Sequence, residues 1–377
     1  MIRSTVAHVN LAALQANYRA LVAHLSAEPA HTAPGVIAVV KANAYGHGAG
    51  RVALALEAAG ATMLACADIE EGVALRRAGV TVPVLVFGAL SVSDLDGILE
   101  HGLTPTISSP FAARAVEAAG ARRDRCIAYH LKIDTGMHRL GFRHDNLERT
   151  LPAVLASPHL RLEGVSTHFA SAEAPDSPLF DEQRRRFDAA LATVARLGGR
   201  PRIRHAANSA ATLRDSRVWY DAVRPGLLLY GIVPPPLAST LSLTPAMSLT
   251  SRVVAVKGVR PGEGVGYGWQ FTADAPRSIA VVPAGYADGL DTRLAGRGSV
   301  LIRGRRAPIV GAVSMDMMTV DVTGLGDVQP GDEVVIIGRQ GDESWQQIDA
   351  REMAALIGTI PWEVVCRLGT RIERVFE

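Results

Sequence analysis

The first two-thirds of the chain alternates between short apolar segments and helical patterns, and this alternation limits the possible folds more than any other feature. Eight segments read as buried strands because they are short, apolar and rich in β-branched residues. They lie at 36–41, 61–67, 82–88, 103–108, 128–134, 162–169, 202–208 and 222–231, with helical patterns at 10–25, 51–60, 67–78, 92–100, 110–119 and 181–197. This count favours a parallel (β/α)8 barrel of the TIM type over an open doubly wound sheet.

The texture of the sequence changes beyond a proline-rich linker at 234–245. Short strands separated by glycine, proline and aspartate turns predict an all-β domain, with a short helix at 348–356. The opening segment STVAHVN is also strand-like, and we expect it to pair with the C-terminal domain. The predicted organisation is an N-terminal strand (1–10), a barrel (11–236) and a C-terminal β domain (237–377).

Composition excludes several classes of function. A net charge of +2 and an apolar fraction of 48% are typical of a soluble globular protein without a nucleic-acid or membrane partner. The 3 cysteines form no C-x-x-C pair, which argues against a disulfide framework or a thiolate metal site. On the same pattern we expect no metal. The N-terminus shows no secretory signal pattern, so we expect a cytoplasmic protein.

The lysines are few and point to chemistry. Lys41, Lys132 and Lys257 are the only lysines among 39 lysine and arginine residues. A position that needs an amine cannot take arginine, because the guanidinium does not deprotonate in proteins, whereas a buried lysine can act as a base or form a Schiff base. Lys41 ends the first predicted strand and precedes a glycine-rich turn, so it is either a nucleophilic amine or a structural lysine whose head group reaches solvent.

Polar groups close several of the predicted strands, and in such barrels the carboxyl ends of the strands carry the active site. These groups are Lys41, Asp134, His168, Asn208-Ser209 and Arg224-Pro225-Gly226. Each could be structural by itself, and Asn208 has the properties of a helix N-cap. The loops after strands seven and eight are the usual phosphate site of these barrels. An amine on strand one and a phosphate site at strands seven and eight together suggest pyridoxal phosphate held by the lysine.

Eight motifs in order resemble the alanine racemase family of fold-type III pyridoxal-phosphate enzymes. They are AVVKANAYGHG, KIDTGMHRLGF, STHFASAE, HAANSAA, RPGLLLYG, GVGYGWQFT, PAGYADG and VSMDMMTVDV. The resemblance covers essentially the whole chain. It implies interconversion of L-alanine and D-alanine, which supplies D-alanine for peptidoglycan.

The resemblance also implies two bases on opposite faces of one carbon. Lys41 would hold the cofactor as a Schiff base and act on the α-proton of the D-enantiomer, while Tyr267 would act on that of the L-enantiomer. Because free tyrosine is a poor base at neutral pH, Tyr267 would need a polar neighbour, and His168 would be one. His168 would also lie against the cofactor ring.

The remaining site residues are likewise implied by the resemblance. Arg224 would face the pyridine nitrogen without protonating it, which should disfavour transamination. Arg139 would bond the cofactor's phenolic oxygen and the substrate carboxylate. Lys132 would be carbamylated to orient Arg139, with a plain lysine that pairs with Asp134 or with a bound anion as the equal alternative. The phosphate would be held by Tyr45, Asn208, Ser209, Gly226, Leu227 and Trp362.

Family members are usually head-to-tail homodimers. The partner's β domain would then supply Tyr267 together with Met315 and Tyr286, which would bound a small substrate pocket. We read Lys257 as structural.

Two positions depart from the family pattern and keep alternatives open. Trp362 stands where tyrosine is usual, and Ala312 stands where arginine is common. An indole offers one donor and no acceptor, so a racemase of serine or of broader specificity is an alternative. A related decarboxylase shares the barrel-plus-β architecture, but it would be expected to use a catalytic cysteine in place of the lysine–tyrosine pair. A non-catalytic pyridoxal-phosphate protein, which is a less favoured alternative, would lack the C-terminal β domain.

Overall fold

The structure is a computed structural model that describes residues 4–28, 33–90, 95–341 and 345–377. The chain forms two compact units. One contains Leu14–Ala44 and Ala49–Leu243, and we call it the barrel unit. The other contains the residues up to Ala13, the short segment Tyr45–Gly48 and Thr244–Glu377, and we call it the β unit.

The barrel unit contains a closed ring of parallel strands, as predicted. The order around the ring is β2, β3, β4, β5, β6, β8, β9 and β10, and the pairing of β10 with β2 closes it. The strands span Gly35–Val39 (β2), Met63–Cys66 (β3), Val84–Val86 (β4), Thr104–Ile107 (β5), Ile127–Asp134 (β6), Leu160–Ser166 (β8), Ile203–His205 (β9) and Ala222–Val223 (β10). A short strand, β7 (Phe142–Arg143), pairs with the end of β6.

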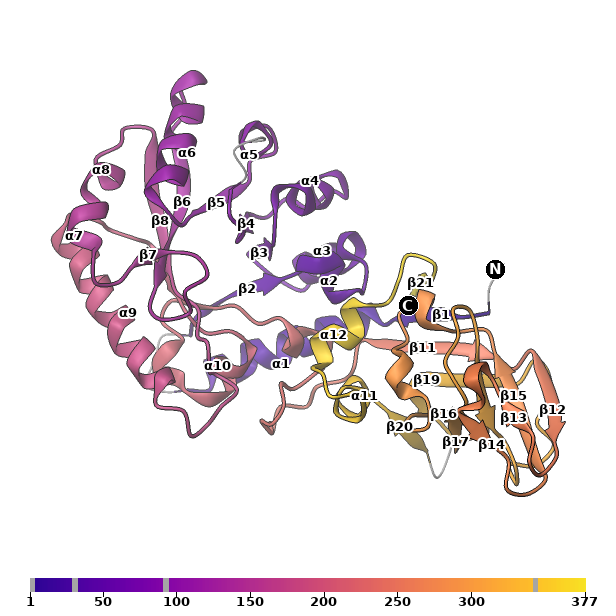
Figure 1. The fold of residues 1–377 in the computed structure, drawn as a ribbon. Helices are drawn as coiled ribbons and strands as arrows, with labels where there is room; N and C mark the ends of the chain where they lie inside the picture. The colour runs from indigo at the N-terminus through magenta and orange to yellow at the C-terminus, as the bar shows by residue number, and fades with distance from the viewer. Residues whose placement is uncertain (1–3, 29–32, 91–94, 342–344) are drawn as a thin grey trace. The chain divides into compact units, whose positions relative to one another are not determined.

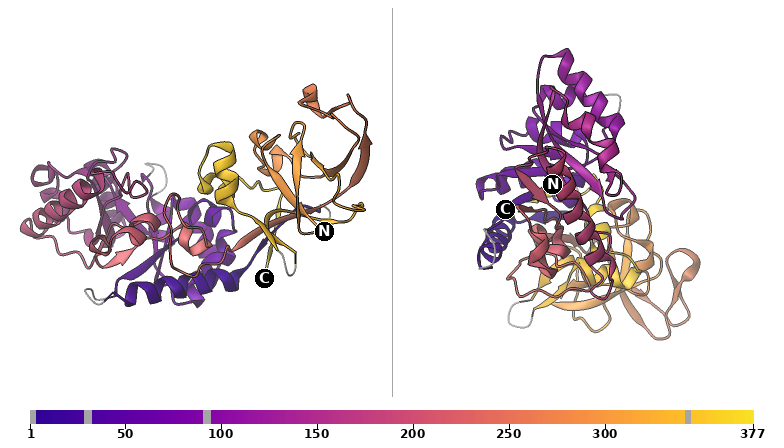
Figure 2. Two further views of the ribbon diagram at one scale, coloured as in Figure 1. Left: turned by 90° about the horizontal axis from the view of Figure 1, so that it is seen from below. Right: turned by 90° about the vertical axis from the view of Figure 1, so that its left-hand side faces the viewer.

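Helices lie outside this ring, as Figure 1 shows and as the further views in Figure 2 repeat. Their apolar faces are buried, as at Phe180, Phe187 and Val194 of α9. The helices are α1 (Leu11–Ser26), α3 (Ala49–Ala58), α4 (Ile69–Arg77), α5 (Asp96–Glu100), α6 (Pro110–Arg122), α7 (Leu147–Thr150), α8 (Pro152–Leu155), α9 (Leu179–Arg196) and α10 (Ser209–Arg214). The prediction of a helix over 92–100 is confirmed for α5, and 92–94 lie outside the described residues.

The strand predicted over 222–231 was wrong in its second half. β10 ends at Val223, and Leu227–Tyr230 forms the 3₁₀ helix η2, which ends at Gly231 with φ 77°. Pro225 has no backbone N–H to donate to a sheet, so the strand cannot continue through it. The following leucines are fully buried, and a short buried apolar run looks the same in sequence whether it is a strand or a helix.

The β unit is built mainly from antiparallel strands, which confirms the predicted fold class. One sheet runs in the order β12, β15, β18, β17, β16, β19, β11, β1, β21, and β20 (Gln346–Ile348) pairs with β19. The strands are β1 (Val6–Val9), β11 (Met247–Arg252), β12 (Ala255–Val259), β15 (Arg277–Val282), β16 (Ser299–Ile302), β17 (Arg305–Val310), β18 (Met318–Asp321), β19 (Glu333–Gln340) and β21 (Glu373–Phe376). β1 pairs with β11 in antiparallel fashion and with β21 in parallel. The unit also carries the helices α11 (Ala350–Ile357) and α12 (Pro361–Cys366).

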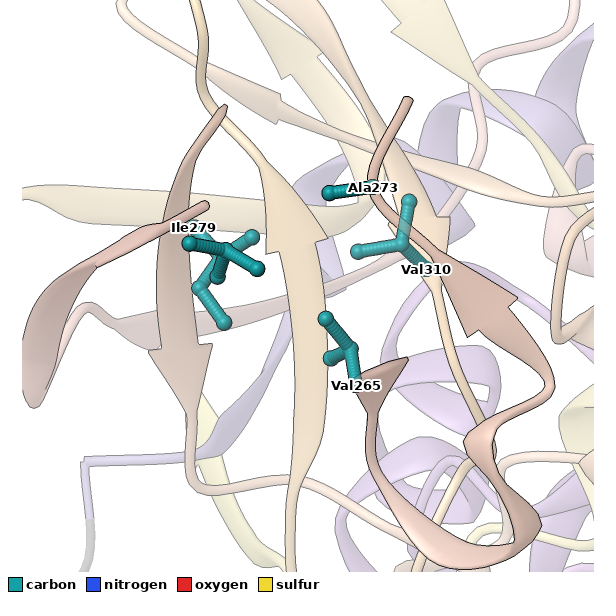
Figure 3. Packing of buried hydrophobic residues seen from close by; sticks show 5 residues of the cluster. Val265, Ala273, Ile279 and Val310 are labelled. Carbon is teal, nitrogen blue, oxygen red and sulfur yellow. The ribbon is translucent and has the colours of Figure 1, made fainter. Parts of the chain in front are cut away.

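A small hairpin of the β unit, β13 (Gly264–Val265) and β14 (Phe271–Thr272), is anchored by its own apolar cluster. Figure 3 shows the side chains of Val265, Ala273, Ile279 and Val310 gathered between this hairpin and the neighbouring strands. Val259 completes the cluster, and Phe271 packs against it. The packing fixes the base of the hairpin, whose tip is the 3₁₀ turn η3 (Tyr267–Trp269).

None of the helices that the structure describes is both long and apolar enough to cross a membrane.

Candidate active site

Lys41 lies directly after β2 and begins an unusual turn. Residues Ala42 to Tyr45 all have φ near +53°, so the element labelled α2 (Lys41–Tyr45) is a left-handed turn. Such backbone costs non-glycine residues roughly 1–2 kcal/mol each. The turn is held from both ends. Glu71 of α4 accepts hydrogen bonds from Ala42 N at 2.6 Å and from Ala67 N at 2.7 Å. Asn43 Oδ1 accepts one from Ala49 N at 2.8 Å.

Four basic side chains of the barrel unit lie within electrostatic range of His168. They are Lys132, Arg224, Arg139 and Lys41. Burial lowers the pKa of His168 well below its ordinary value, and these charges lower it further. Burial likewise lowers the pKa of Lys132 well below its usual range, with Arg224 and Arg139 adding to the effect and Asp134 opposing it. This end of the barrel therefore attracts anions and favours a neutral amine at Lys132.

Asp134, which ends β6, shapes the loop that carries Arg139. Its Oδ1 accepts hydrogen bonds from the backbone N–H groups of Gly136, Met137 and His138 at 3.0–3.1 Å. Burial alone would raise the pKa of this carboxyl, but the three N–H donors bring it below its ordinary value. Asp134 therefore acts as the anchor of the loop.

Arg224 is buried, and its NH2 nitrogen has three possible acceptors within reach of its two hydrogens. NH2 donates to the carbonyls of Thr167 at 2.7 Å and Ala206 at 3.0 Å, and it lies 3.4 Å from Nδ1 of His168. Burial lowers the pKa of Arg224 to about 9, so the guanidinium remains charged at neutral pH. A guanidinium offers no acceptor, so an Nδ1–H of His168 would face donors only, and the neutral ring is better placed with its proton on Nε2.

His168 is held in turn by a buried glutamine on α9. Gln183 Nε2 donates to the carbonyl of His168 and to Oγ1 of Thr135, both at 3.1 Å. Its Oε1 accepts from Ala170 N at 2.8 Å. These bonds hold the backbone that carries His168.

Ser209 joins the loops after β9 and β10. Its Oγ accepts hydrogen bonds from Gly226 N at 2.9 Å and from Leu228 N at 3.5 Å. Asn208 is the N-cap of α10, as expected, with Oδ1 accepting from Ala211 N. The backbone N–H groups of Ser209 and Ala210 at the start of α10 have no intrahelical acceptor, as at every helix start, which suits this place to an anion.

The β unit contains a second group of predicted site residues, around Tyr45. Tyr45 is buried, and burial raises the pKa of its phenol, with Cys366 of α12 raising it further. Gly46 packs so closely on α12 that an added Cβ would lie 2.2 Å from the carbonyl oxygen of Val365. Tyr45 and the helix that carries Trp362 therefore belong to one packed region.

The remaining predicted residues of the β unit are exposed. Tyr267 is 77% exposed at the tip of the β13–β14 hairpin, and Tyr286 and Met315 are 46% and 52% exposed. The last two are neighbours, because Tyr286 N donates to Ser314 O and Ala287 N to Met315 O, both at 3.0 Å. Lys257 is exposed on β12, the strand position expected for it, and its structural role stays a prediction.

Four residues that hold the site in place were not predicted from the sequence. Glu71 and Gln183 lie within helices, whereas Thr167 directly follows β8 and His205 ends β9. The predicted strands ran on to 169 and 208, so neither Thr167 nor His205 stood at a predicted strand end. Gln183 carried a usable signal, since it is a polar residue on the apolar face of an amphipathic helix.

The donors of the barrel unit fit pyridoxal phosphate. The basic groups around His168 would attract the anionic cofactor. Asp134 opposes them, but its Oδ1 is already occupied by three backbone N–H groups. A lysine at the end of the first strand and an anion-suited loop pair at the last two strands supply the two attachments that this cofactor needs.

A parallel barrel with a lysine at its mouth and an attached β domain defines a class of barrel enzymes that hold a cofactor through an amine. Residues 9–234 match the model of the alanine racemase N-terminal domain, and residues 246–376 match that of the C-terminal domain. The chain belongs to the alanine racemase family and is an amino-acid racemase, an isomerase.

Relatives match over the full length. The alanine racemase of Symbiobacterium thermophilum is 43% identical over 100% of this chain and 97% of its own length. The alanine racemase from D-cycloserine-producing Streptomyces lavendulae has a TM-score of 0.93 and 35% identity, over 100% of this chain and 98% of that one. The alanine racemase of Bartonella henselae, solved with covalently bound pyridoxal phosphate, has a TM-score of 0.88 and 28% identity, over 99% of both chains.

Proposed function

We propose that the chain interconverts L-alanine and D-alanine with pyridoxal phosphate held covalently by Lys41. The observation that carries the proposal is Lys41 at the end of β2, at a mouth where Lys132, Arg139 and Arg224 also lie within range of His168. Once bound, the cofactor would supply an electron sink that acidifies the substrate's α-hydrogen. The Bartonella henselae enzyme with covalently bound pyridoxal phosphate supports the assignment.

We propose that several groups hold the cofactor. Ser209, whose Oγ accepts from Gly226 N, would donate its hydroxyl hydrogen to the phosphate, with the backbone of Gly226 and Leu227 beside it. Tyr45 and Trp362 would be further contacts, and Asn208 would be the cap that keeps the first turn of α10 in place. Arg224 would face the ring nitrogen. Because Arg224 does not release a proton, that nitrogen would stay unprotonated.

Lys41 and Tyr267 would be the two bases, Lys41 removing the α-proton of D-alanine and Tyr267 that of L-alanine. The tautomer of His168 supports this role for Tyr267. Since Nδ1 of His168 faces Arg224, Nε2–H is left to donate toward a phenolate oxygen, which would make tyrosine a better acid–base group.

Arg139 would bind the substrate carboxylate, on a loop that Asp134 already holds in shape. Lys132 would be carbamylated, because carbamylation requires the neutral amine that burial and the nearby arginines favour. The resulting anion would lie within range of Arg139 and would orient it.

A homodimer would complete the site, with Tyr267, Tyr286 and Met315 supplied by the partner subunit. The large side chains of the β unit support self-association, since Tyr267, Trp269, Tyr286, Met315 and Met317 are between 46% and 77% exposed. A pair of inactive variants tests this point. Lys41→Ala and Tyr267→Phe proteins should regain activity when mixed and allowed to exchange subunits if the two bases come from different chains. A mixture that stays inactive would place both bases in one chain.

The assay for the reaction is chiral analysis of alanine after incubation of the protein with L-alanine and pyridoxal phosphate. Lys41→Ala should abolish formation of D-alanine, and the exposed Lys257→Ala variant, a matched loss of one amine, should not. For the two-base mechanism, Tyr267→Phe in D2O should lose exchange of the α-hydrogen of L-alanine while retaining exchange from D-alanine. Equal loss from both enantiomers would contradict the assignment of faces.

Trp362 is the observation that favours a broader substrate range as a second candidate. A parent protein that binds the cofactor but leaves L-alanine unchanged, while racemising serine, would establish that alternative. The proposed cellular role is supply of D-alanine for peptidoglycan in the cytoplasm.

A further inference from the structure

Two histidines inside the barrel lie in line with Arg224 and have no part in the mechanism above. His130 of β6 and His205 of β9 are both fully buried. Nδ1 of His130 lies 2.7 Å from Nε2 of His205, and Nδ1 of His205 lies 2.9 Å from NH1 of Arg224. The three side chains form a continuous hydrogen-bonded chain from the barrel interior to the site.

The direction of every hydrogen bond in this chain follows from Arg224. The guanidinium can only donate, so Nδ1 of His205 must accept. Burial lowers the pKa of His130 to about 4 and that of His205 well below its ordinary value, so both rings are neutral at pH 7. The proton of His205 is then on Nε2, where it is donated to Nδ1 of His130, and the proton of His130 is on its own Nε2.

A glycine gives the His130 ring its room. His130 is paired across the sheet with Gly164 of β8, which lies between β6 and β9. A Cβ at position 164 would lie 2.6 Å from Nδ1 of His130 and 2.8 Å from its Cγ. These distances are too short for any real contact, so the imidazole reaches His205 only because residue 164 has no side chain.

The arrangement is costly if its purpose is stability alone. Nε2 of His130 has no hydrogen-bond partner among the residues that the structure describes. A buried donor without a partner destabilises the folded state, and an apolar side chain at this position would avoid that cost. The cost is consistent with a role that the ring performs through its other nitrogen.

We propose that His130 is a positioning residue for racemisation, acting on Arg224 through His205. Nδ1 of His130 accepts a hydrogen bond from Nε2–H of His205. This bond holds the His205 ring in the tautomer whose Nδ1 lone pair accepts a hydrogen bond from Arg224. Without His130, the Nε2–H of His205 would be buried unpaired. Moving that proton to Nδ1 would set a donor against a donor at Arg224, and turning the ring would remove the acceptor from Arg224. The functional part of this proposal rests on the proposed placement of Arg224 at the cofactor ring.

Three substitutions separate the acceptor from the bulk of the ring. His130→Leu removes the acceptor, and His130→Asn keeps an oxygen close to the position of Nδ1. Gly164→Ala removes no polar group, but its added Cβ would push the His130 ring away from His205. The control is Gly72→Ala in α4, where the added Cβ would meet a methyl group of Leu103 at 2.7 Å, a similar crowding at another place in the same unit.

The first readout needs no cofactor. Long-range ¹H–¹⁵N spectra of apo protein labelled with [¹⁵N]histidine, at pH 7, report which ring nitrogen carries the proton. We expect His205 in the Nε2–H form in the parent protein, His130→Asn and Gly72→Ala, and a loss of that single form in His130→Leu and Gly164→Ala. Because the measurement is made on the apo protein, it stands even if the proposed reaction fails.

The second readout is made on the loaded enzyme. We expect kcat to fall by about 10-fold and the dissociation constant for pyridoxal phosphate to rise in His130→Leu and Gly164→Ala, with His130→Asn close to the parent. If His130→Leu does not fold, Gly164→Ala and His130→Asn decide between the outcomes. The proposal is overturned if His205 keeps its tautomer in Gly164→Ala, if that variant is no worse than Gly72→Ala, or if His130→Asn loses as much as His130→Leu.

Discussion

Glu71→Gln should weaken cofactor binding although Glu71 is not expected to touch the cofactor. The carboxylate of Glu71 accepts two backbone hydrogen bonds, from Ala42 N at 2.6 Å and Ala67 N at 2.7 Å. It thereby ties the left-handed turn after Lys41 to the end of β3. A glutamine retains one oxygen but places an amide NH2 against the other N–H group.

The size of the effect follows from the backbone and from exposure. Ala42 to Tyr45 lie in the left-handed region, at roughly 1–2 kcal/mol each, so the turn depends on the bonds that hold it. A hydrogen bond to a charged acceptor contributes about 1.5–3 kcal/mol, but Ala42 is exposed and water can replace part of the bond. We therefore expect a loss of about 1–2 kcal/mol in total, which corresponds to a 5- to 30-fold weaker affinity for pyridoxal phosphate.

Titration of apo protein with pyridoxal phosphate, followed by absorbance, measures the affinity, and urea unfolding measures the stability. Glu70→Gln is the matched control, since Glu70 is the exposed preceding residue on the same helix and loses the same charge. If Glu71→Gln and Glu70→Gln have equal affinities and equal unfolding free energies, the turn does not depend on this carboxylate.

Four further predictions follow from the same structure. Asp134 has a folded-state pKa below its unfolded value of about 3.9, so its contribution to stability is present above that pH and is lost as the pH falls below it. Asp134→Asn should remove this part of the acid dependence in urea unfolding measured from pH 6 to pH 3. Gly46→Ala should destabilise the protein by about 1–3 kcal/mol in the same assay, because its Cβ would meet the carbonyl of Val365. Tyr267→Phe should leave unfolding unchanged within about 0.5 kcal/mol, because the ring is exposed, while racemisation falls by about 10²- to 10⁴-fold. Trp362→Tyr should tighten pyridoxal phosphate about 5-fold if the phenol reaches the phosphate, and Trp362→Phe, which lacks the hydroxyl, should not.

Much of the fold could be predicted because it depends on patterns that are local in sequence. The ring of parallel strands, the change to an all-β unit and the strand at Val6–Val9 all follow from runs of apolar residues and the turn residues between them. The error at 222–231 arose where this signal is ambiguous, since Leu227 to Tyr230 are buried on every side and form a 3₁₀ helix. Lys41, Asp134, His168 and Arg224 were predicted because each follows or closes such a run.

What the sequence by itself determined is therefore the order of the elements and the chemical groups placed at their ends. The tertiary structure alone decided how those groups are held and which tautomer or charge each carries. Glu71 meets Ala42, Gln183 meets His168, and His130 meets His205 across Gly164, and these pairs are far apart in sequence. No periodicity records such contacts, because hydrogen-bond partners and burial depend on distances in space that exist only after the barrel has closed.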